Sequence, residues 1–313
     1  MKTLVMETMP NLFWEEIQRK GLNAFFTESC NSKSEIKIII IRTKINFDKN
    51  YFADFPNLKM LIRAGTGFDN IDLSEAKKRN VIVCNTPEAN AYAAYEQTLS
   101  FILALIKQHQ ICKDQMLKGN WKENIKPNWE VSDLNVLVVG VGRVGTRVAD
   151  TLRYLGAQVR GVDPYLSISE WKQKNIEPII YKEGLEWCNL LTFHCPLTIE
   201  TRNYFNLKEL DILQNPIWLV NTSRGKVVSE QAVSHGLLKG KVIGFASDVF
   251  SEEPWKMKKF AEYPNVILSP HVGSHTKKAK IRMSLETLEV WSNYVDMHQI
   301  NTEVNKKFIF SNQ

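Results

Sequence analysis

The sequence predicts an α/β protein with two domains, each organised around a parallel sheet. The length of 313 residues suits about two domains of ordinary size. Short apolar runs rich in β-branched residues alternate with segments of helical period, which is typical of buried parallel strands covered by helices. A glycine-rich turn near residue 140 opens a second series of such units, and this restart indicates the second domain.

The first hundred residues supply the strands and helices of the first domain. Four short apolar segments are expected to be its strands, namely residues 3–6, 36–41, 58–62 and 81–84. Two segments between them are expected to be helices, residues 10–21 and residues 72–79. This alternation predicts a small parallel sheet with helices on its faces.

Residues 90–118 are predicted to form one long helix. Apolar residues such as Ala93, Ile102 and Leu105 give it an apolar face, and turn-forming residues first appear at Gly119. A helix of this length that precedes the second series of strands can connect the two domains.

The glycine-rich turn lies between a strand and a helix. The β-branched run Val136–Val139 leads into Gly140, and the helix that follows places Val144, Val148, Leu152 and Leu155 on one face. Gly156 is suited to end this helix. A second strand, residues 158–162, then ends at Asp163.

Each part of this unit has a physical role in a dinucleotide site. Gly140 permits the tight turn, Gly142 lets a pyrophosphate approach the backbone, and Gly145 lets the helix pack close to the sheet. The helix N-terminus offers N–H groups and a positive dipole end. Asp163 can accept hydrogen bonds from the ribose hydroxyls and repels a 2′-phosphate, which favours NAD over NADP. Arg143 is either a phosphate contact or a solvated side chain.

The remaining strands of the second domain each end in a polar loop. They are expected at residues 190–194, 217–221, 242–246 and 265–268, with helices at 167–175 and 276–297. Three successive loops present Arg224, Glu253 and His271. Because parallel strands end at one edge of a sheet, these side chains are expected to gather beside the glycine-rich turn.

An imidazole, a carboxylate and a guanidinium beside a nicotinamide can interconvert an alcohol and a carbonyl group. Histidine has an ordinary pKa of about 6.5, so His271 can take or give the substrate proton near neutral pH. Glu253 would orient the imidazole and stabilise its protonated form, and Arg224 can bind a carboxylate with its planar fork. The acidic and histidine residues at 252–275 lack metal-ligand spacing, so we expect no metal ion.

Two positions in the first domain are candidates for anion binding. Arg42 and Lys44 follow the strand 36–41, and they are either ligand-binding or solvated loop residues. Arg63 is followed by a glycine-containing turn that can expose backbone N–H groups to a carboxylate or phosphate. His194, at the end of the strand 190–194, is expected to have a structural role.

Composition limits the partners that we expect. The net charge of +6 is mild and spread along the chain, without a basic run interleaved with aromatic residues, so we expect no nucleic-acid partner. The apolar runs are too short to span a bilayer, and the N-terminus lacks the pattern of a signal peptide. Five cysteines without a CxxC pair suit a reducing compartment. We therefore expect a cytoplasmic protein that binds no membrane.

Five motifs give the chain a resemblance to the NAD-dependent D-isomer-specific 2-hydroxyacid dehydrogenases. They are VGVGRVG at 139–145, HCPLTIETRNYF at 194–205, LVNTSRGKVV at 219–228, DVFSEEP at 248–254 and SPHVGSHT at 269–276. The resemblance implies two Rossmann-like or flavodoxin-like parallel-sheet domains with an interdomain cleft. The substrate domain would comprise residues 1–98 plus 284–313, and the NAD-binding domain residues 99–283.

The resemblance also implies roles for particular residues. The catalytic residues would be Arg224, Glu253 and His271. The positions that would contact NAD are Gly140, Gly142, Arg143, Val144, Gly145, Asp163, Cys195, Pro196, Thr222, Asp248, His271 and Gly273. It further implies a homodimer, with residues 99–131 near its interface.

Within the family, the first domain resembles the phosphoglycerate dehydrogenase branch. The similar segments are IIIRTK at 39–44, IRAGTGFDNIDL at 62–73 and VCNTPEANAYAAYEQT at 83–98. This implies oxidation of 3-phosphoglycerate to 3-phosphohydroxypyruvate in serine biosynthesis. Arg42 and Arg63 would bind the charged ends of the substrate, and the backbone of Ala64 and Gly65 its carboxylate. The chain ends without the C-terminal regulatory domain of longer members, so we expect no serine feedback through such a domain.

Other functions remain open at this point. Short members of the family include reductases of glyoxylate, hydroxypyruvate or other 2-ketoacids and erythronate-4-phosphate dehydrogenase. A member of another functional class would be an NAD(H)-sensing binding protein without catalytic turnover.

Overall fold

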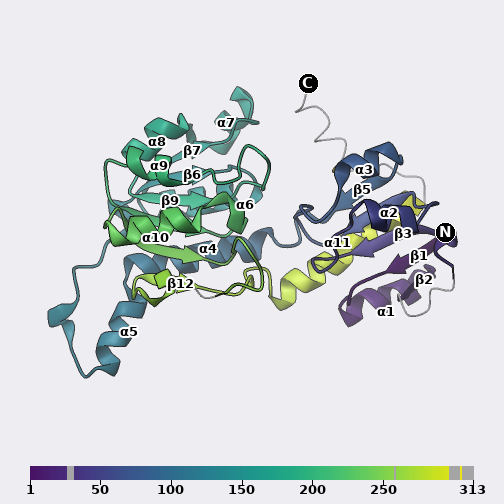
Figure 1. Ribbon diagram of the computed structural model, residues 1–313, viewed down its shortest axis with the longest axis horizontal. Coiled ribbons are helices and arrows are strands. Elements are labelled where there is room, and N and C mark those ends of the chain that lie inside the picture. Colours follow the sequence, from purple (N-terminus) through teal and green to yellow (C-terminus); the bar gives the residue numbers. More distant parts are fainter. Residues whose placement is uncertain (27–31, 257–258, 296–303, 305–313) are drawn as a thin grey trace. The chain divides into compact units, whose positions relative to one another are not determined.

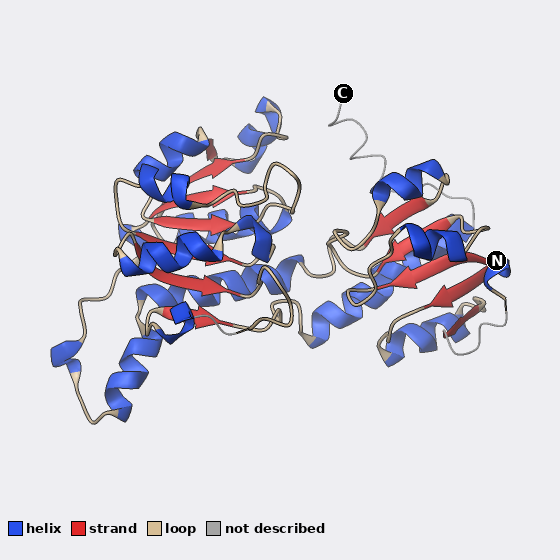
Figure 2. Ribbon diagram, in the orientation of Figure 1, coloured by secondary structure: helices blue, strands red, loops and turns tan. Residues whose placement is uncertain are grey.

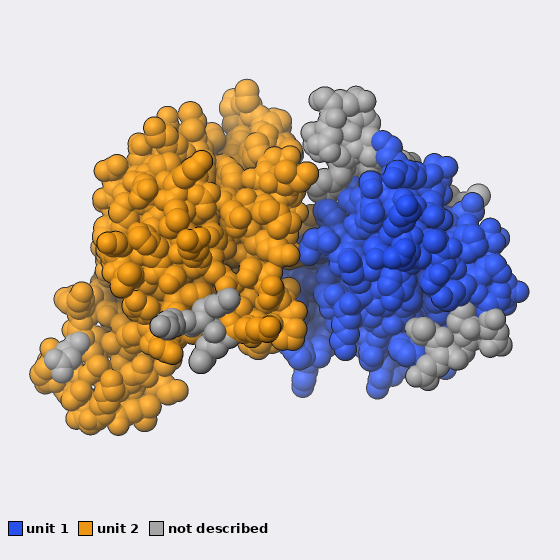
Figure 3. All heavy atoms as spheres, in the orientation of Figure 1, with its two compact units in different colours: residues 1–92, 274–313 blue, residues 93–273 orange. Residues whose placement is uncertain are grey.

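The computed structural model describes residues 1–26, 32–256, 259–295 and 304 of the chain. The chain forms two compact units, which Figure 3 colours separately. Unit 1 comprises Met1–Tyr92 and Ser274–Gln313, and unit 2 comprises Ala93–Gly273. These boundaries precede the expected ones at 98/99 and 283/284, because nearly all of helix α4 (Ala91–Ile106) falls in unit 2 and all of helix α11 (Lys277–Val295) in unit 1.

Unit 1 is built on a five-stranded parallel sheet with the strand order β2-β1-β3-β4-β5 (Figure 1). The strands are β1 (Lys2–Val5), β2 (Ala24–Phe26), β3 (Ile36–Ile41), β4 (Met60–Arg63) and β5 (Ile82–Asn85). The helices are α1 (Asn11–Arg19), α2 (Lys49–Asp54), α3 (Leu73–Lys78) and α11. The short edge strand β2 and the helix α2 were absent from the sequence-based prediction.

The isoleucine run of β3 explains why unit 1 has helices on both faces of its sheet. Alternate side chains of a strand point to opposite faces. Ile38 and Ile40 accordingly pack with residues of α1 and α11, such as Phe13 and Trp291. Ile39 and Ile41 pack on the opposite face with residues of α2 and α3, such as Phe52.

Unit 2 is built on a seven-stranded sheet with the strand order β12-β11-β10-β9-β6-β7-β8, again entirely parallel (Figure 2). The strands are β6 (Asn135–Val139), β7 (Gln158–Val162), β8 (Glu177–Pro178), β9 (Leu190–Phe193), β10 (Ile217–Asn221), β11 (Val242–Ser247) and β12 (Val266–Leu268). The helices are α4, α5 (His109–Leu117), α6 (Arg143–Tyr154), α7 (Ile168–Lys174), α8 (Tyr181–Trp187), α9 (Leu207–Ile212) and α10 (Glu230–Leu238).

Both faces of this sheet are buried. Val136 and Val138 of β6 pack with residues of α4 and α6, whereas Leu137 and Val139 pack with residues of α8, α9 and α10. Val148 and Leu152 of α6 are buried, as predicted, but Leu155 lies at the helix C-terminus and is 45% exposed, so its assignment to the apolar face was wrong.

The single long helix predicted over residues 90–118 is instead two helices. Helix α4 ends at Ile106 and α5 begins at His109, with Gln108 between them in a left-handed conformation at φ 51°. A single non-glycine residue in this conformation redirects the chain and ends the first helix. Among the described residues, no helix is both long and apolar enough to cross a membrane.

Each sheet has a point at which the strand order reverses. The chain leaves β1 for β2 on one side and later adds β3 on the other side, so the reversal lies between β1 and β3. In unit 2 the corresponding reversal lies between β6 and β9. Ligands of open α/β sheets bind outside the carboxyl ends of the strands at such points, so the loops after these strands are where functional side chains are sought.

Candidate active site

The glycine-rich turn lies at the reversal point of the unit 2 sheet. Gly140 follows β6 and has a φ of 90°, a conformation that favours glycine. Its N–H donates to the carbonyl oxygen of Val162 at 2.8 Å. A Cβ atom on Gly140 would lie 2.6 Å from the backbone nitrogen of Cys195, in the loop after β9. The turn therefore passes directly against the neighbouring loop, which only glycine allows.

The next two glycines shape the start of helix α6 in different ways. A Cβ atom on Gly145 would overlap the carbonyl oxygen of Gly140, so this residue permits the close packing of helix and turn. A Cβ atom on Gly142 would meet no atom within 4 Å. Gly142 is the N-cap of α6 and no side chain caps this helix end. Open space in front of an uncapped helix N-terminus fits the diphosphate of a dinucleotide.

Asp163 lies at the end of β7, beside the glycine-rich turn. One oxygen of its carboxylate accepts the N–H of Val141 at 2.9 Å, and the other accepts the N–H of Tyr165 at 3.1 Å. Each carboxylate oxygen can accept more than one hydrogen bond, so the ribose hydroxyls of NAD can still be bound. The predicted elements of the nucleotide site are thus brought together at one edge of the sheet.

His271 and Glu253 form a direct pair. The Nδ1 atom of His271 lies 2.6 Å from the Oε2 atom of Glu253, and the other carboxylate oxygen accepts the N–H of Phe250 at 3.0 Å. Burial raises the pKa of Glu253, but the hydrogen bonds from His271 and Phe250 and the charges of His271 and Arg224 outweigh it. The net pKa of Glu253 is therefore lowered. The carboxylate is ionised near neutral pH and holds one nitrogen of the imidazole.

The backbone of His271 is held by Asp248. His271 has a φ of 53° and donates its N–H to the carbonyl oxygen of Asp248 at 2.9 Å. The buried Asp248 carboxylate accepts the N–H groups of Val272 and Gly273 at 2.8 and 2.7 Å, and also the hydroxyl of Ser269. In this structure the Asp248 carboxylate therefore shapes the loop that carries His271, a role that sequence reasoning missed.

Arg224 lies in the loop that follows β10, directly before Gly225. Its Nη1 atom donates to the carbonyl oxygen of Ser223 at 2.7 Å. The side chain of Asn221 ties this loop together, because it donates to the Arg224 carbonyl at 3.0 Å and accepts from Ser223. Thr222, a predicted cofactor contact, shares a hydrogen bond of 2.7 Å with Thr98 of helix α4.

The loop after β9 contributes backbone rather than reactive side chains. Cys195 is buried, and burial raises the pKa of its thiol to about 12, so the thiol is neutral near pH 7. Burial among protein atoms lowers the pKa of His194 to about 3, and its Nε2 atom lies 3.0 Å from the hydroxyl of Thr192. This neutral, hydrogen-bonded imidazole agrees with the structural role expected for it. The exposed Pro196 follows Cys195 and makes this loop turn at the sheet edge.

In unit 1, Arg42 directly follows strand β3, and Arg63 is the last residue of the neighbouring strand β4. Arg42 donates from Nη1 to the carbonyl oxygen of Thr8 at 3.0 Å. Arg63 is 8% exposed, and its guanidinium lies over Gly65, where a Cβ atom would overlap it. Both arginines therefore lie at the carboxyl edge of the sheet, as the sequence predicts.

The backbone of Ala64 and Gly65 does not offer the expected anion site. The N–H of Ala64 donates to the carbonyl of Ile41 at 2.8 Å, and the N–H of Gly65 donates to the hydroxyl of Thr86 at 2.6 Å. Since both N–H groups are used within the protein, the prediction that they bind a carboxylate disagrees with the structure. The motif could not reveal this, because Ile41 belongs to β3 and Thr86 directly follows β5.

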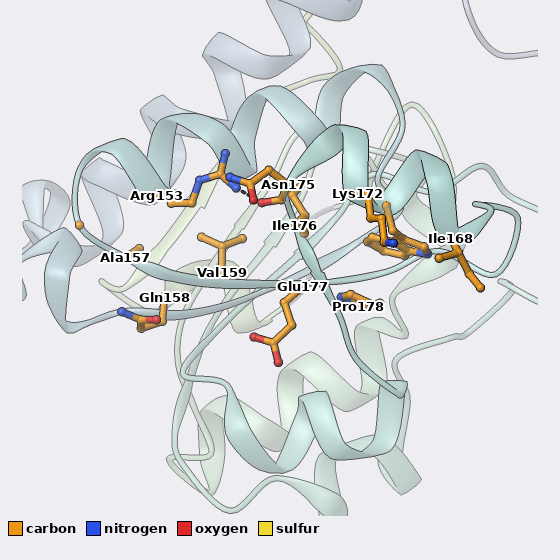
Figure 4. A pocket seen from close by; sticks show the side chains of 12 residues that line it. Arg153, Ala157, Gln158, Val159, Ile168, Lys172, Asn175, Ile176, Glu177 and Pro178 are labelled. Carbon is orange, nitrogen blue, oxygen red and sulfur yellow. Dashed lines mark hydrogen bonds between the residues drawn. The ribbon is translucent and has the colours of Figure 1, made fainter.

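A hollow of about 780 Å³ opens elsewhere on unit 2 (Figure 4). Its lining comes from the end of α6, the start of β7, and the segment of α7 and β8, and includes Arg153, Trp171, Lys172 and Glu177. None of its lining residues belongs to the glycine-rich turn or to the predicted catalytic residues. It begins at the amino end of β7, so we do not assign it to the active site.

Across the described residues, no group of three or more His, Cys, Asp or Glu side chains could hold a metal ion.

Sequence comparison places these motifs in a known family. Residues 99–273 match the family model of the D-isomer specific 2-hydroxyacid dehydrogenase, NAD binding domain. D-3-phosphoglycerate dehydrogenase of Bacillus subtilis (strain 168) is 31% identical over 251 residues, covering 80% of this chain and 48% of that protein. The human D-3-phosphoglycerate dehydrogenase is 30% identical over 259 residues, covering 83% and 48%. The chain thus spans about half the length of these relatives.

Comparison with solved structures agrees with this family match. The D-lactate dehydrogenase from Aquifex aeolicus, complexed with NAD and lactic acid, has a TM-score of 0.84 at 26% identity, covering 94% of this chain and 96% of that one. A glyoxylate reductase from Paecilomyes thermophila has a TM-score of 0.89 at 20% identity, covering 98% of each chain. At this identity the similarity shows the shared fold alone. The fold, the dinucleotide turn and the family match lead to one conclusion: the chain belongs to the NAD-dependent D-isomer-specific 2-hydroxyacid dehydrogenases.

Proposed function

We propose that this chain oxidises 3-phosphoglycerate to 3-phosphohydroxypyruvate with NAD, as a step of serine biosynthesis in the cytoplasm. The observation that carries the catalytic part is the 2.6 Å pair of His271 and Glu253. The substrate is inferred from the two arginines of unit 1 and from relatives that bear the name D-3-phosphoglycerate dehydrogenase. In this proposal unit 1 binds the substrate and unit 2 binds NAD.

The proposed chemistry assigns a separate task to each of the three proposed catalytic residues, Arg224, Glu253 and His271. Glu253 holds Nδ1 of His271, so Nε2 is the ring nitrogen that takes the proton of the substrate hydroxyl. The ionised Glu253 stabilises the imidazolium that results. Arg224 binds the substrate carboxylate and polarises the adjacent oxygen. NAD, when bound, supplies the hydride acceptor.

The nucleotide would be held mainly by the glycine-rich turn and by the loops beside it. The diphosphate would lie at Gly142, Arg143, Val144 and Gly145, and the ribose hydroxyls at Asp163. The other positions proposed to line the nucleotide site are Gly140, Cys195, Pro196, Thr222, Asp248, His271 and Gly273. Arg42 and Arg63 would bind the negatively charged ends of the substrate, since two fixed guanidinium groups suit a phosphate-bearing acid.

The experiment that tests this proposal is a comparison of substrates. NADH formation is measured with 3-phosphoglycerate, glycerate, lactate and 4-phosphoerythronate, and NADH consumption with phosphohydroxypyruvate, hydroxypyruvate and glyoxylate. We expect the highest kcat/KM for the phosphorylated three-carbon pair. Preference for unphosphorylated acids would reassign the chain as a 2-ketoacid reductase. Binding of NADH without turnover of any acid would indicate an NAD(H)-sensing protein.

The catalytic assignment has its own test. His271→Ala is expected to lower kcat by roughly 10²–10⁴-fold, the usual contribution of a general acid–base residue. His235→Ala, at an exposed position of helix α10, is the matched control and is expected to leave kcat unchanged. Near-normal turnover of His271→Ala would refute the mechanism.

We also propose that the chain forms a homodimer through the region of helix α5. No residue of α5 is buried, and Met116, Leu117 and Trp121 are 57%, 76% and 64% exposed. Large apolar side chains exposed at several positions along one short stretch of the chain suit a protein interface. Light scattering is expected to give twice the chain mass for the wild type and a monomer for Leu117→Asp. Tyr154→Asp, at an exposed apolar position on α6, is the control and is expected to stay dimeric.

A further inference from the structure

The carboxylate of Glu7 accepts the N–H groups of four consecutive residues. Glu7 lies just after strand β1 and is 8% exposed. Its Oε1 atom accepts from Arg42 at 2.7 Å and Ile45 at 3.4 Å. Its Oε2 atom accepts from Thr43 at 3.2 Å and Lys44 at 3.1 Å. A largely buried carboxylate is costly unless it is well hydrogen-bonded, and here the backbone of the loop at 42–45 satisfies it.

The same loop is held from its other side by Asn70. The side-chain amide of Asn70 donates to the carbonyl oxygens of Arg42 and Ile45, at 3.1 and 2.7 Å. The backbone carbonyl of Asn70 accepts the N–H of Phe47 at 2.7 Å. Glu7 therefore fixes the N–H groups of the loop at 42–45, and Asn70 fixes the carbonyl groups at the two ends of this loop.

These contacts link three loops at the carboxyl edge of the unit 1 sheet. Glu7 follows β1, the loop at 42–45 follows β3, and Asn70 lies in the segment after β4, which ends at Arg63. Strands β1, β3 and β4 are neighbours in the sheet, and its strand order reverses between β1 and β3. Glu7 and the loop at 42–45 thus lie on the two sides of the reversal point, where a ligand of an open α/β sheet usually binds.

The position of Glu7 changes how an anion can be bound there. Consecutive backbone N–H groups at such a point are suited to an anion of the ligand. Here the protein's own carboxylate takes these N–H groups, so a bound anion must use the side chains of the loop. Arg42 supplies such a side chain. Its Nη1 atom donates a hydrogen bond to the carbonyl oxygen of Thr8, the residue next to Glu7.

We propose that Glu7 is a positioning residue for substrate binding. It fixes the backbone of the loop at 42–45 so that the Arg42 guanidinium is held ready for the anionic end of the substrate. Asn70 couples this loop to the segment that begins at Arg63. The inference rests on the proposed function, in which Arg42 and Arg63 bind a phosphate-bearing 2-hydroxyacid.

The test compares Glu7→Gln with Glu15→Gln. Both substitutions remove one negative charge from unit 1, but Glu15 is an exposed residue of helix α1. A glutamine at position 7 replaces one acceptor oxygen by an amide group that faces N–H donors. We expect Glu7→Gln to raise KM for 3-phosphoglycerate by about tenfold, with kcat and the KM for NAD nearly unchanged. Glu15→Gln is expected to match the wild type.

A second measurement follows the loop without any substrate. Hydrogen–deuterium exchange of the peptide that covers residues 42–45 is expected to be faster in Glu7→Gln and unchanged in Glu15→Gln. Asn70→Ala, which leaves Glu7 in place, is expected to raise KM for the acid in the same direction. It keeps the proposal testable if Glu7→Gln does not fold.

The outcomes distinguish a failure of the proposed substrate from a failure of the role proposed for Glu7. The wild-type comparison of phosphorylated and unphosphorylated acids alone decides the proposed substrate. For whichever acid the wild type prefers, an unchanged KM in Glu7→Gln would overturn the role of Glu7. A fall in kcat with KM unchanged would also overturn it, because the residue would then serve the chemical step rather than substrate binding.

Discussion

Gly225 rests so closely against Phe250 that a Cβ atom on the glycine would overlap the Phe250 carbonyl group. Gly225 follows Arg224, and Phe250 donates its N–H to the Glu253 carboxylate at 3.0 Å. The backbone segments that carry Arg224 and Glu253 are therefore in direct contact. The spacing between the guanidinium and the carboxylate depends on the absence of a side chain at position 225.

Gly225→Ala is expected to lower kcat by about tenfold to a hundredfold. The added methyl group must push the two segments apart, and small displacements of catalytic groups carry costs of this size. Steady-state kinetics with the preferred acid measures the effect, and Lys226→Ala, at the exposed next position, is the control. Full activity of Gly225→Ala would mean that the two segments can separate without affecting the reaction.

The His271–Glu253 pair is expected to stabilise the fold in a pH-dependent way. The pKa of Glu253 is lowered in the folded chain, although burial acts in the opposite direction. Its stabilising contribution is therefore present above the ordinary pKa of 4.5 and is lost as the pH falls through the lower folded-state pKa.

Urea unfolding of Glu253→Gln beside the wild type measures this contribution. We expect the variant to be less stable near pH 7 and the difference to shrink as the pH falls below 4.5. Glu252→Gln, an exposed neighbour, serves as the charge-matched control and is expected to show no such convergence. A stability difference that stayed constant with pH would contradict the lowered pKa.

The sequence predicts the elements whose signal is local. The run Ile38–Ile41 predicts a buried strand because every side chain in it is apolar, and the structure uses both of its faces. The turn from Gly140 to Gly145 predicts its own geometry, because Gly140 is constrained by the adjacent loop at Cys195 and Gly145 by the carbonyl oxygen of Gly140.

What the sequence could not predict depends on partners far away in the chain. The N–H of Gly65 was expected to bind a ligand, but Thr86 accepts it, and no pattern within the motif encodes that contact. The break at Gln108 escaped prediction because the flanking residues suit a helix and only the backbone conformation ends it. Glu7 carries no recognisable motif, since its role arises from four N–H groups of residues 42–45.

Asp248→Asn is expected to destabilise the protein and to lower kcat. The buried carboxylate accepts the N–H groups of Val272 and Gly273 and the Ser269 hydroxyl, and an amide cannot accept all three. Loss of acceptors at a buried site typically costs about 1–3 kcal/mol. Thermal or urea unfolding measures the stability, and kcat reports the displacement of His271.

The comparison with Asp211→Asn tests whether the effect is specific. Asp211 lies at an exposed position of helix α9, and its side chain is 86% exposed. This control is expected to leave both stability and kcat close to those of the wild type. If Asp248→Asn did the same, the loop at 269–273 would be held by its remaining backbone contacts alone.

Asp163→Asn is expected to weaken the preference for NAD over NADP. The carboxylate lies at the end of β7 and is held in place by the N–H groups of Val141 and Tyr165. A 2′-phosphate next to a fixed carboxylate is repelled, and juxtaposed like charges cost several kcal/mol. Removing the charge while keeping an acceptor oxygen should raise kcat/KM for NADP relative to NAD by about tenfold or more.

The ratio of kcat/KM for the two cofactors, measured with the same acid, gives the result directly. Asp150→Asn, an exposed position on helix α6, is the control for the loss of charge alone. The ratio is expected to change in Asp163→Asn and to remain at the wild-type value in Asp150→Asn. An unchanged ratio in both variants would mean that Asp163 does not face the ribose, and its hydrogen bonds with Val141 and Tyr165 would then be its whole function.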